Sequence, residues 1–189
     1  MTTWRSSLAA LGALLALGGC DEAALGGLLG GGAPPLTQAA MVAGDVTLAA
    51  PPGFCIDRVN LRPQFALLAR CDTLGARQAA SDAPIGVISV SVAPAGPLPD
   101  LPSAEDLAQA YGLGAPRDAS AGDGLILFRA EGPAPIEGMA PTHWRAAARI
   151  GEYMLGLTLY GPEGGAAVSA EGAVILRSLV ARSRAQSEG

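Results

Sequence analysis

Few residues in this chain of 189 have side chains suited to chemistry. The chain has one histidine, His143, and its 12 lysine and arginine positions are all arginine. A serine nucleophile activated by lysine is therefore excluded, and one activated by histidine would have to use His143. The sequence contains no Gly-x-Ser-x-Gly turn of the kind that presents a nucleophilic serine. We therefore expect a protein that is not an enzyme and that uses no cofactor.

Metal and phosphate sites also lack their usual residues. With one histidine, the chain is a poor candidate for a zinc site. The glycines at 112–114 and 122–124 are too sparse for a phosphate-binding loop, and Asp118 and Asp123 lack the spacing of a calcium loop. Paired carboxylates remain as an alternative enzyme chemistry, although an aromatic content of 4% leaves few rings to stack on a sugar.

The overall charge limits the class of partner. The formal net charge is -5, which argues against a nucleic-acid partner because phosphate binding needs clustered positive charge. The chain is 50% hydrophobic but poor in aromatic residues, so its core must be built from alanine, valine, leucine and isoleucine.

The first residues, MTTWRSSLAALGALLALGGC, have the layout of a secretory signal. Arg5 supplies a positive start, and the apolar run that follows is too short to span a bilayer. The junction Leu17-Gly18-Gly19-Cys20 resembles the lipobox of bacterial lipoproteins. This resemblance implies a signal peptide at 1–19, cleavage before Cys20, and a membrane anchor of lipid on the Cys20 thiol. An ordinary signal, or an uncleaved anchor with a chance cysteine, is the alternative.

The same resemblance implies a bacterial cell-envelope location that faces the periplasm. Asp21 directly after Cys20 favours the inner over the outer membrane, by the rule that holds for enteric lipoproteins. Residues 20–44 are dense in glycine and proline, which predicts a flexible, lipidated tether. We expect a single domain from 45 to 189.

Cys55 and Cys71 are the cysteines left once Cys20 carries lipid. An even pair in an oxidising compartment predicts a structural disulfide. Closing the loop of about 15 residues between them would add roughly 3 kcal/mol of stability. A metal site would need more ligands nearby, and a redox pair would normally be Cys-x-x-Cys.

The clearest structural pattern runs from Thr142 to Tyr160. Alternation predicts two strands joined by a type II′ turn at Gly151-Glu152. In the expected register, Trp144 faces the core and lies on the strand face that is wholly apolar. The opposite face carries His143, Arg145, Arg149 and Tyr160, which we take as a possible partner-binding face; a solvated sheet face is the alternative.

Other segments complete the expected fold. Alternating or apolar runs predict strands at 45–50, 65–71, 88–92 and 125–131, and helices are expected at about 103–112 and 169–184. Because most connections are short, we predict an α+β domain with a mainly antiparallel sheet and two helices packed on one face. This order of elements is similar to that of the PsbP family, a resemblance that rests on no motif and transfers no functional residue.

These observations lead to one main functional hypothesis and two alternatives. The main one is a non-enzymatic, membrane-anchored periplasmic lipoprotein that binds a protein partner or assists an envelope complex. The first alternative is a lipoprotein module that binds a small molecule or a lipid. The second is an enzyme with unrecognised carboxylate chemistry.

Overall fold

The computed structural model describes residues 35–75, 82–96 and 100–188. The expectations for the signal peptide, for Cys20 and for the first part of the tether lie outside these residues. No helix within the described ranges is long and apolar enough to cross a membrane. The strands are β1 Gln38–Met41, β2 Val46–Ala49, β3 Phe54–Ile56, β4 Phe65–Arg70, β5 Val87–Pro94, β6 Arg117–Gly122, β7 Leu125–Glu131, β8 Thr142–Ile150 and β9 Tyr153–Tyr160. The helices are α2 Ala104–Ala110 and α3 Ala170–Ser187, with short 3₁₀ turns at Val42–Gly44 and Ala166–Val168.

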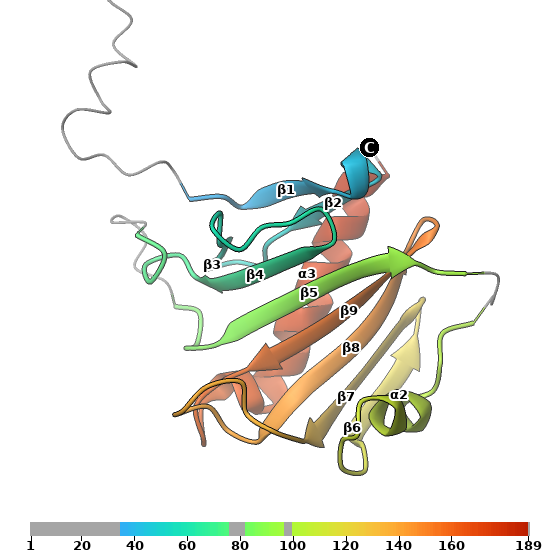
Figure 1. The fold of residues 1–189 in the computed structure, drawn as a ribbon. Helices are drawn as coiled ribbons and strands as arrows, with labels where there is room; N and C mark the ends of the chain where they lie inside the picture. Colours follow the sequence, from blue (N-terminus) through green and yellow to red (C-terminus); the bar gives the residue numbers. More distant parts are fainter. Residues whose placement is uncertain (1–34, 76–81, 97–99, 189) are drawn as a thin grey trace, which may run out of the picture. The chain divides into compact units, whose positions relative to one another are not determined.

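A seven-stranded sheet in the order β3-β4-β5-β9-β8-β7-β6 forms the centre of the domain (Figure 1). Every neighbouring pair in it is antiparallel. The prediction of an α+β fold with a mainly antiparallel sheet is therefore confirmed. The segment from α2 to β8 separates β5 from β9 in sequence, yet these two strands lie side by side at the middle of the sheet.

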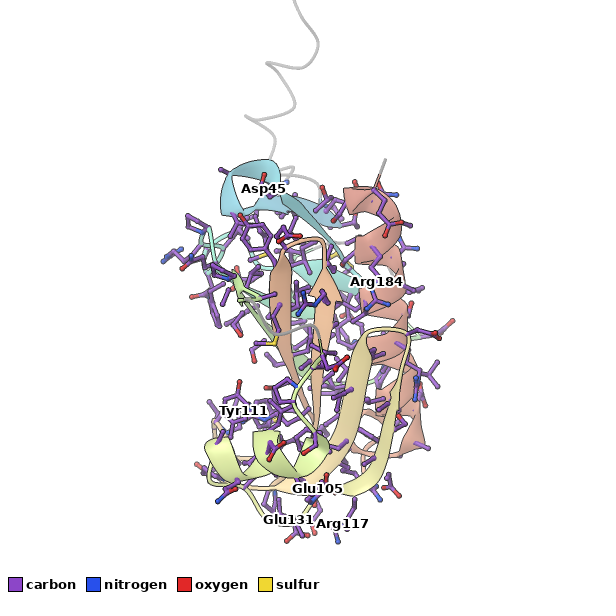
Figure 2. All side chains as sticks on the ribbon, turned by 90° about the vertical axis from the view of Figure 1, so that its right-hand side faces the viewer. Asp45, Glu105, Tyr111, Arg117, Glu131 and Arg184 are labelled. Atoms are coloured by element: carbon purple, nitrogen blue, oxygen red, sulfur yellow. A yellow bond between two sulfur atoms is a disulfide. The ribbon has the colours of Figure 1, made fainter. Side chains whose placement is uncertain are left out.

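The two helices cover opposite faces of this sheet, and the expectation that they share one face is wrong (Figure 2). Leu125 and Leu127 of β7 belong to the core beneath α3. Ile126 and Phe128, which alternate with them, pack in a second core with Ala104 and Ala108 of α2. The reason lies in the run Leu-Ile-Leu-Phe, which makes both faces of β7 apolar, so that each face needs a cover.

The register expected for the β8–β9 hairpin is confirmed. Trp144 pairs with Leu159, Arg145 with Thr158 and Arg149 with Met154. Gly151 has a φ of 53°, the sign required at the first position of a type II′ turn. Because side chains alternate along a strand, this register places Trp144 toward α3 and Arg145 on the other face.

The folded domain begins earlier than residue 45, so the expected boundary of the tether is corrected. Residues 38–41 form β1, which pairs with β2 in a two-stranded sheet, and Leu36 forms a bridge with Ile56. Met41 is 1% exposed and belongs to the main core. The apolar side chains of Ala39 and Met41 are buried in the main core together with Val46 and Leu48 of β2, which local glycine and proline content cannot reveal.

Helix α3 also completes the hydrogen bonding of β2. The hydroxyl of Ser183 accepts a hydrogen bond from the backbone N–H of Ala49, and that of Ser187 accepts one from the N–H of Thr47. Arg182 donates to the carbonyl oxygen of Ala50. The free edge of β2 is thereby covered by side chains of the helix, which explains why the polar Ser183 is fully buried.

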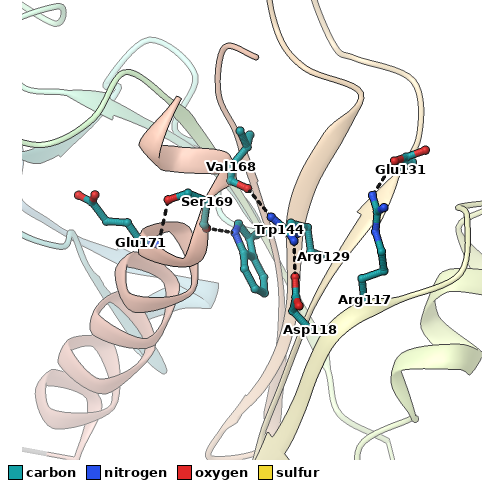
Figure 3. A network of polar contacts seen from close by, with 8 residues as sticks. All are labelled: Arg117, Asp118, Arg129, Glu131, Trp144, Val168, Ser169 and Glu171. Atoms are coloured by element: carbon teal, nitrogen blue, oxygen red, sulfur yellow. Dashed lines mark hydrogen bonds and ion pairs between the residues drawn. The ribbon is translucent and has the colours of Figure 1, made fainter. Parts of the chain in front are cut away.

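The start of α3 is fixed to the sheet through Trp144 (Figure 3). Its indole N–H donates to the carbonyl oxygen of Ser169, the N-cap residue of the helix. Arg129 of β7 lies over the indole ring, donates to the carbonyl oxygen of Val168 and pairs with Asp118. This network sets the position of the helix on the sheet at its N-terminal end.

The structure contains the predicted disulfide between Cys55 and Cys71. Cys55 lies in β3 and Cys71 directly follows β4, so the bond links the first two strands of the large sheet. Both residues are buried. The bond therefore reinforces a pairing that involves three residues of the short strand β3.

Candidate binding site

A pocket of about 250 Å³ lies on the outer face of the sheet, the face opposite α3. We call it the outer-face pocket. Its floor is formed by small and hydroxyl side chains of the three central strands, including Ser89, Ser91 and Thr158. Tyr111, which directly follows α2, and Phe65 at the start of β4 form its sides. The pocket is thus largely apolar, with a few hydroxyl groups and one cation, Arg145.

The pocket exists because β9 has a glycine at its centre. A Cβ atom at Gly156 would lie 2.8 Å from Oγ of Ser91 and 3.8 Å from the phenol oxygen of Tyr111. Any larger side chain at this position would therefore project into the space between β5 and Tyr111. In the fold, Gly156 pairs with Ser91 on one side and Ala147 on the other, so small residues lie side by side across three strands.

Arg145 projects from β8 along the same face and meets Tyr111. Its guanidinium carbon is 4.7 Å from the centre of the Tyr111 ring, within the range of a cation–π contact. Tyr111 is 54% exposed and lies on the side of the sheet away from α3 (Figure 2). This contact connects the sheet, through Arg145, with the segment that follows α2, through Tyr111.

Arg145 has no carboxylate partner among the described residues. It takes no part in the ion pairs Arg70–Asp72, Arg117–Glu131 and Arg129–Asp118. Arg145 instead donates from Nε to Nε2 of His143 over 3.2 Å. Its terminal nitrogens therefore remain available for an anion, the group that a guanidinium binds best.

His143 is buried rather than solvated, although it lies on the face predicted to be polar. It is 0% exposed, and its ring is 4.7 Å from that of Tyr160. Burial lowers the pKa of His143 below its ordinary value of 6.5, the hydrogen bond with Pro141 opposes this shift, and the charge of Arg145 adds to it. The ring is therefore favoured in its neutral form.

The structure brings together three of the four residues proposed for the partner-binding face. His143, Arg145 and Tyr160 are in contact, in the order Tyr160, His143, Arg145. Arg149 lies apart, because four residues along a strand correspond to about 13 Å. It lines a separate hollow with Asp100 and Gly124.

Three contributors to the pocket were missed by sequence reasoning: Tyr111, Gly156 and Phe65. Tyr111 falls inside the helix expected at about 103–112, whereas it follows the last turn of α2 and meets Arg145. The signal for Gly156 was present, since glycine in the middle of a strand often marks close approach of another group. No comparable signal pointed to Phe65, whose place depends on how β4 pairs with β5.

Comparison with known proteins gives a structural likeness and no match in sequence. No family model matches the chain, and no curated protein matches it. A solved structure of the Ran-binding protein Mog1p from Saccharomyces cerevisiae is similar, with a TM-score of 0.48 and 14% sequence identity. The likeness covers 80% of this chain and 95% of that one.

This finding corrects the main functional hypothesis. The solved structure that the chain resembles is described as that of a Ran-binding protein from yeast, and not as that of a membrane-anchored periplasmic lipoprotein. A likeness with a TM-score below 0.5 transfers neither an activity nor a partner to this chain.

Proposed function

We propose that this domain binds a protein partner through the outer-face pocket, with an acidic side chain of the partner placed on Arg145. The observation that carries the proposal is a guanidinium that stacks on an exposed tyrosine beside an apolar pocket and has no carboxylate of its own among the described residues. Arginine and tyrosine are enriched among the residues that dominate binding energy at protein interfaces.

The size of the pocket favours a side chain of a protein over a separate small molecule. Small-molecule sites usually have volumes of about 300–1,000 Å³ and enclose most of the ligand. The outer-face pocket has about 250 Å³ and is bordered by exposed rings, Tyr111 at 54% and Phe65 at 38% exposure. Such a hollow suits one apolar anchor residue next to the acidic residue, with the surrounding surface covered by the rest of the partner.

The chain itself provides a matched pair of variants for the test. Random linear peptides displayed as a library are selected on the purified domain, and the enriched peptides are measured by calorimetry. We expect them to contain Glu or Asp next to an apolar residue. Arg145→Gln should weaken their binding roughly tenfold or more, because a hydrogen bond to a charged group is lost. Arg149→Gln removes the same charge from the same strand face outside the pocket and should leave affinity within about twofold.

Gly156→Val provides a steric test of the same site. The larger side chain would fill the floor of the pocket beside Ser91, so we expect binding to be lost while the β8–β9 register is kept. The proposal is overturned if the enriched peptides lack acidic residues. It is also overturned if Arg145→Gln and Arg149→Gln weaken binding equally, since the effect would then be one of general charge.

A further inference from the structure

Two hydrogen bonds define the protonation of His143. Its Nδ1 lies 2.9 Å from the carbonyl oxygen of Pro141, and its Nε2 lies 3.2 Å from Nε of Arg145. A carbonyl oxygen can only accept and a guanidinium N–H can only donate. The proton must therefore be on Nδ1, and the lone pair of Nε2 must face Arg145. A ring protonated at both nitrogens would lose the second bond and place two cations in contact.

The surroundings hold the ring in this orientation. Tyr160 of β9 lies against it at an interplanar angle of 35°. Ala130 of β7 is its strand partner, and a Cβ atom at Gly132 would be 3.3 Å from its Cε1. Among the residues that the structure describes, the ionisable groups in contact with the ring are Arg145 on its own strand and the phenol of Tyr160. The neighbouring strand β7 presents an uncharged residue, Ala130, opposite it.

We propose that His143 is the positioning residue of the binding site, which holds the guanidinium of Arg145 over Tyr111 with its terminal nitrogens toward the ligand carboxylate. This inference rests on the proposed function. The bond to His143 uses Nε, which leaves both terminal nitrogens of the fork for bidentate contact with a carboxylate. A guanidinium already held in place loses less conformational freedom on binding, so affinity is gained without a further contact to the ligand.

The binding arm of the test uses the acidic peptides enriched on the wild-type domain. His143→Leu removes the acceptor while the position stays filled, and we expect a five- to tenfold loss of affinity, equal to one ordinary hydrogen bond. His143→Gln offers a carbonyl oxygen to Arg145 and should restore most of that loss. In the Arg145→Gln background, His143→Leu should have no further effect, because it acts through Arg145.

Two outcomes of this arm would overturn the inference. One is an equal loss in His143→Leu and His143→Gln. The other is a His143→Leu effect of unchanged size when Arg145 is already absent. Either result would show that His143 supports the fold in general and does not act through Arg145.

A second arm needs no ligand and therefore separates this inference from the proposed function. The ¹⁵N shifts of the imidazole in the free wild-type domain report which nitrogen carries the proton. We expect Nδ1 protonated and Nε2 unprotonated at neutral pH, together with an Arg145 Nε–H signal protected from exchange that loses protection in His143→Leu. An Nε2-protonated ring would refute the positioning role. If the NMR signals are as expected but the selection enriches no acidic peptide, the geometry of His143 and Arg145 stands and the proposed function is refuted.

Discussion

The indole N–H of Trp144 donates to the carbonyl oxygen of Ser169 over 2.6 Å, which joins the sheet to the N-cap residue of the long helix α3. The contact is close because Gly172 lies in the first turn of α3. A Cβ atom there would be 2.4 Å from Cδ1 of Trp144 and 2.1 Å from the carbonyl oxygen of Ala167. Glycine normally weakens a helix, yet Gly172 is the residue that lets α3 approach the sheet.

The stability of the domain should therefore be sensitive to a single methyl group at Gly172. Gly172→Ala removes the glycine penalty in the helix, yet we expect the free energy of unfolding to fall by about 1–3 kcal/mol, because backbone and indole must both move. Chemical denaturation followed by Trp144 fluorescence measures this change. Gly122→Ala is the control, since nothing lies within 4 Å of a Cβ atom at that position. A Gly172→Ala variant more stable than wild type would contradict the packing.

Ser183 should contribute to stability through β2 rather than through its own helix. Ser183→Ala leaves the N–H of Ala49 without its partner in a buried place, and we expect a loss of about 1–3 kcal/mol. Hydrogen exchange at Ala49 should accelerate in the same variant. Ser178→Ala, at a half-buried position of the same helix, is the comparison. If both substitutions change the free energy of unfolding equally, the loss in Ser183→Ala comes from helix propensity and not from the hydrogen bond to the edge of β2.

The disulfide should stabilise the domain because it lowers the conformational entropy of the unfolded chain. Cys55 and Cys71 are 16 residues apart, and replacing both by alanine should lower the free energy of unfolding by roughly 3 kcal/mol. Mass spectrometry of unreduced peptides checks that the bond is present in the purified protein. Recovery of both thiols alkylated without prior reduction would contradict the structure.

The stability of the domain should fall in mildly acidic solution because of His143. Its pKa in the folded state is below the ordinary value of 6.5, so the unfolded chain binds more protons between the two values. The free energy of unfolding should therefore be highest above pH 6.5 and decrease as the pH falls toward the folded-state pKa. The slope from this one group is at most about 1.4 kcal/mol per pH unit. In His143→Gln this part of the slope should disappear, and an unchanged slope would exclude His143 as its source.

Local patterns in the sequence were enough to predict elements whose geometry is set by near neighbours. The turn at Gly151 and the alternation on either side of it fixed the β8–β9 register, since a shift by one residue would bury two arginines. The helix expected from about 103 begins at Ala104, where Ser103 is the N-cap and forms a capping box with Asp106. Asp123 and Gly124, both with positive φ, form the turn between β6 and β7, and this dipeptide is a typical hairpin signal in a sequence.

The candidate site depended on contacts between segments distant in sequence. The sequence placed His143, Arg145 and Tyr160 on one strand face, because side-chain direction alternates along a hairpin. It could not show that His143 is buried, that Tyr111 would lie on Arg145, or that Gly156 would leave a pocket between them. Those relationships follow from the pairing of β5 with β9 and from the position of α2 on the face opposite α3. Burial and pocket shape are sums over such distant contacts, and only the tertiary structure decided them.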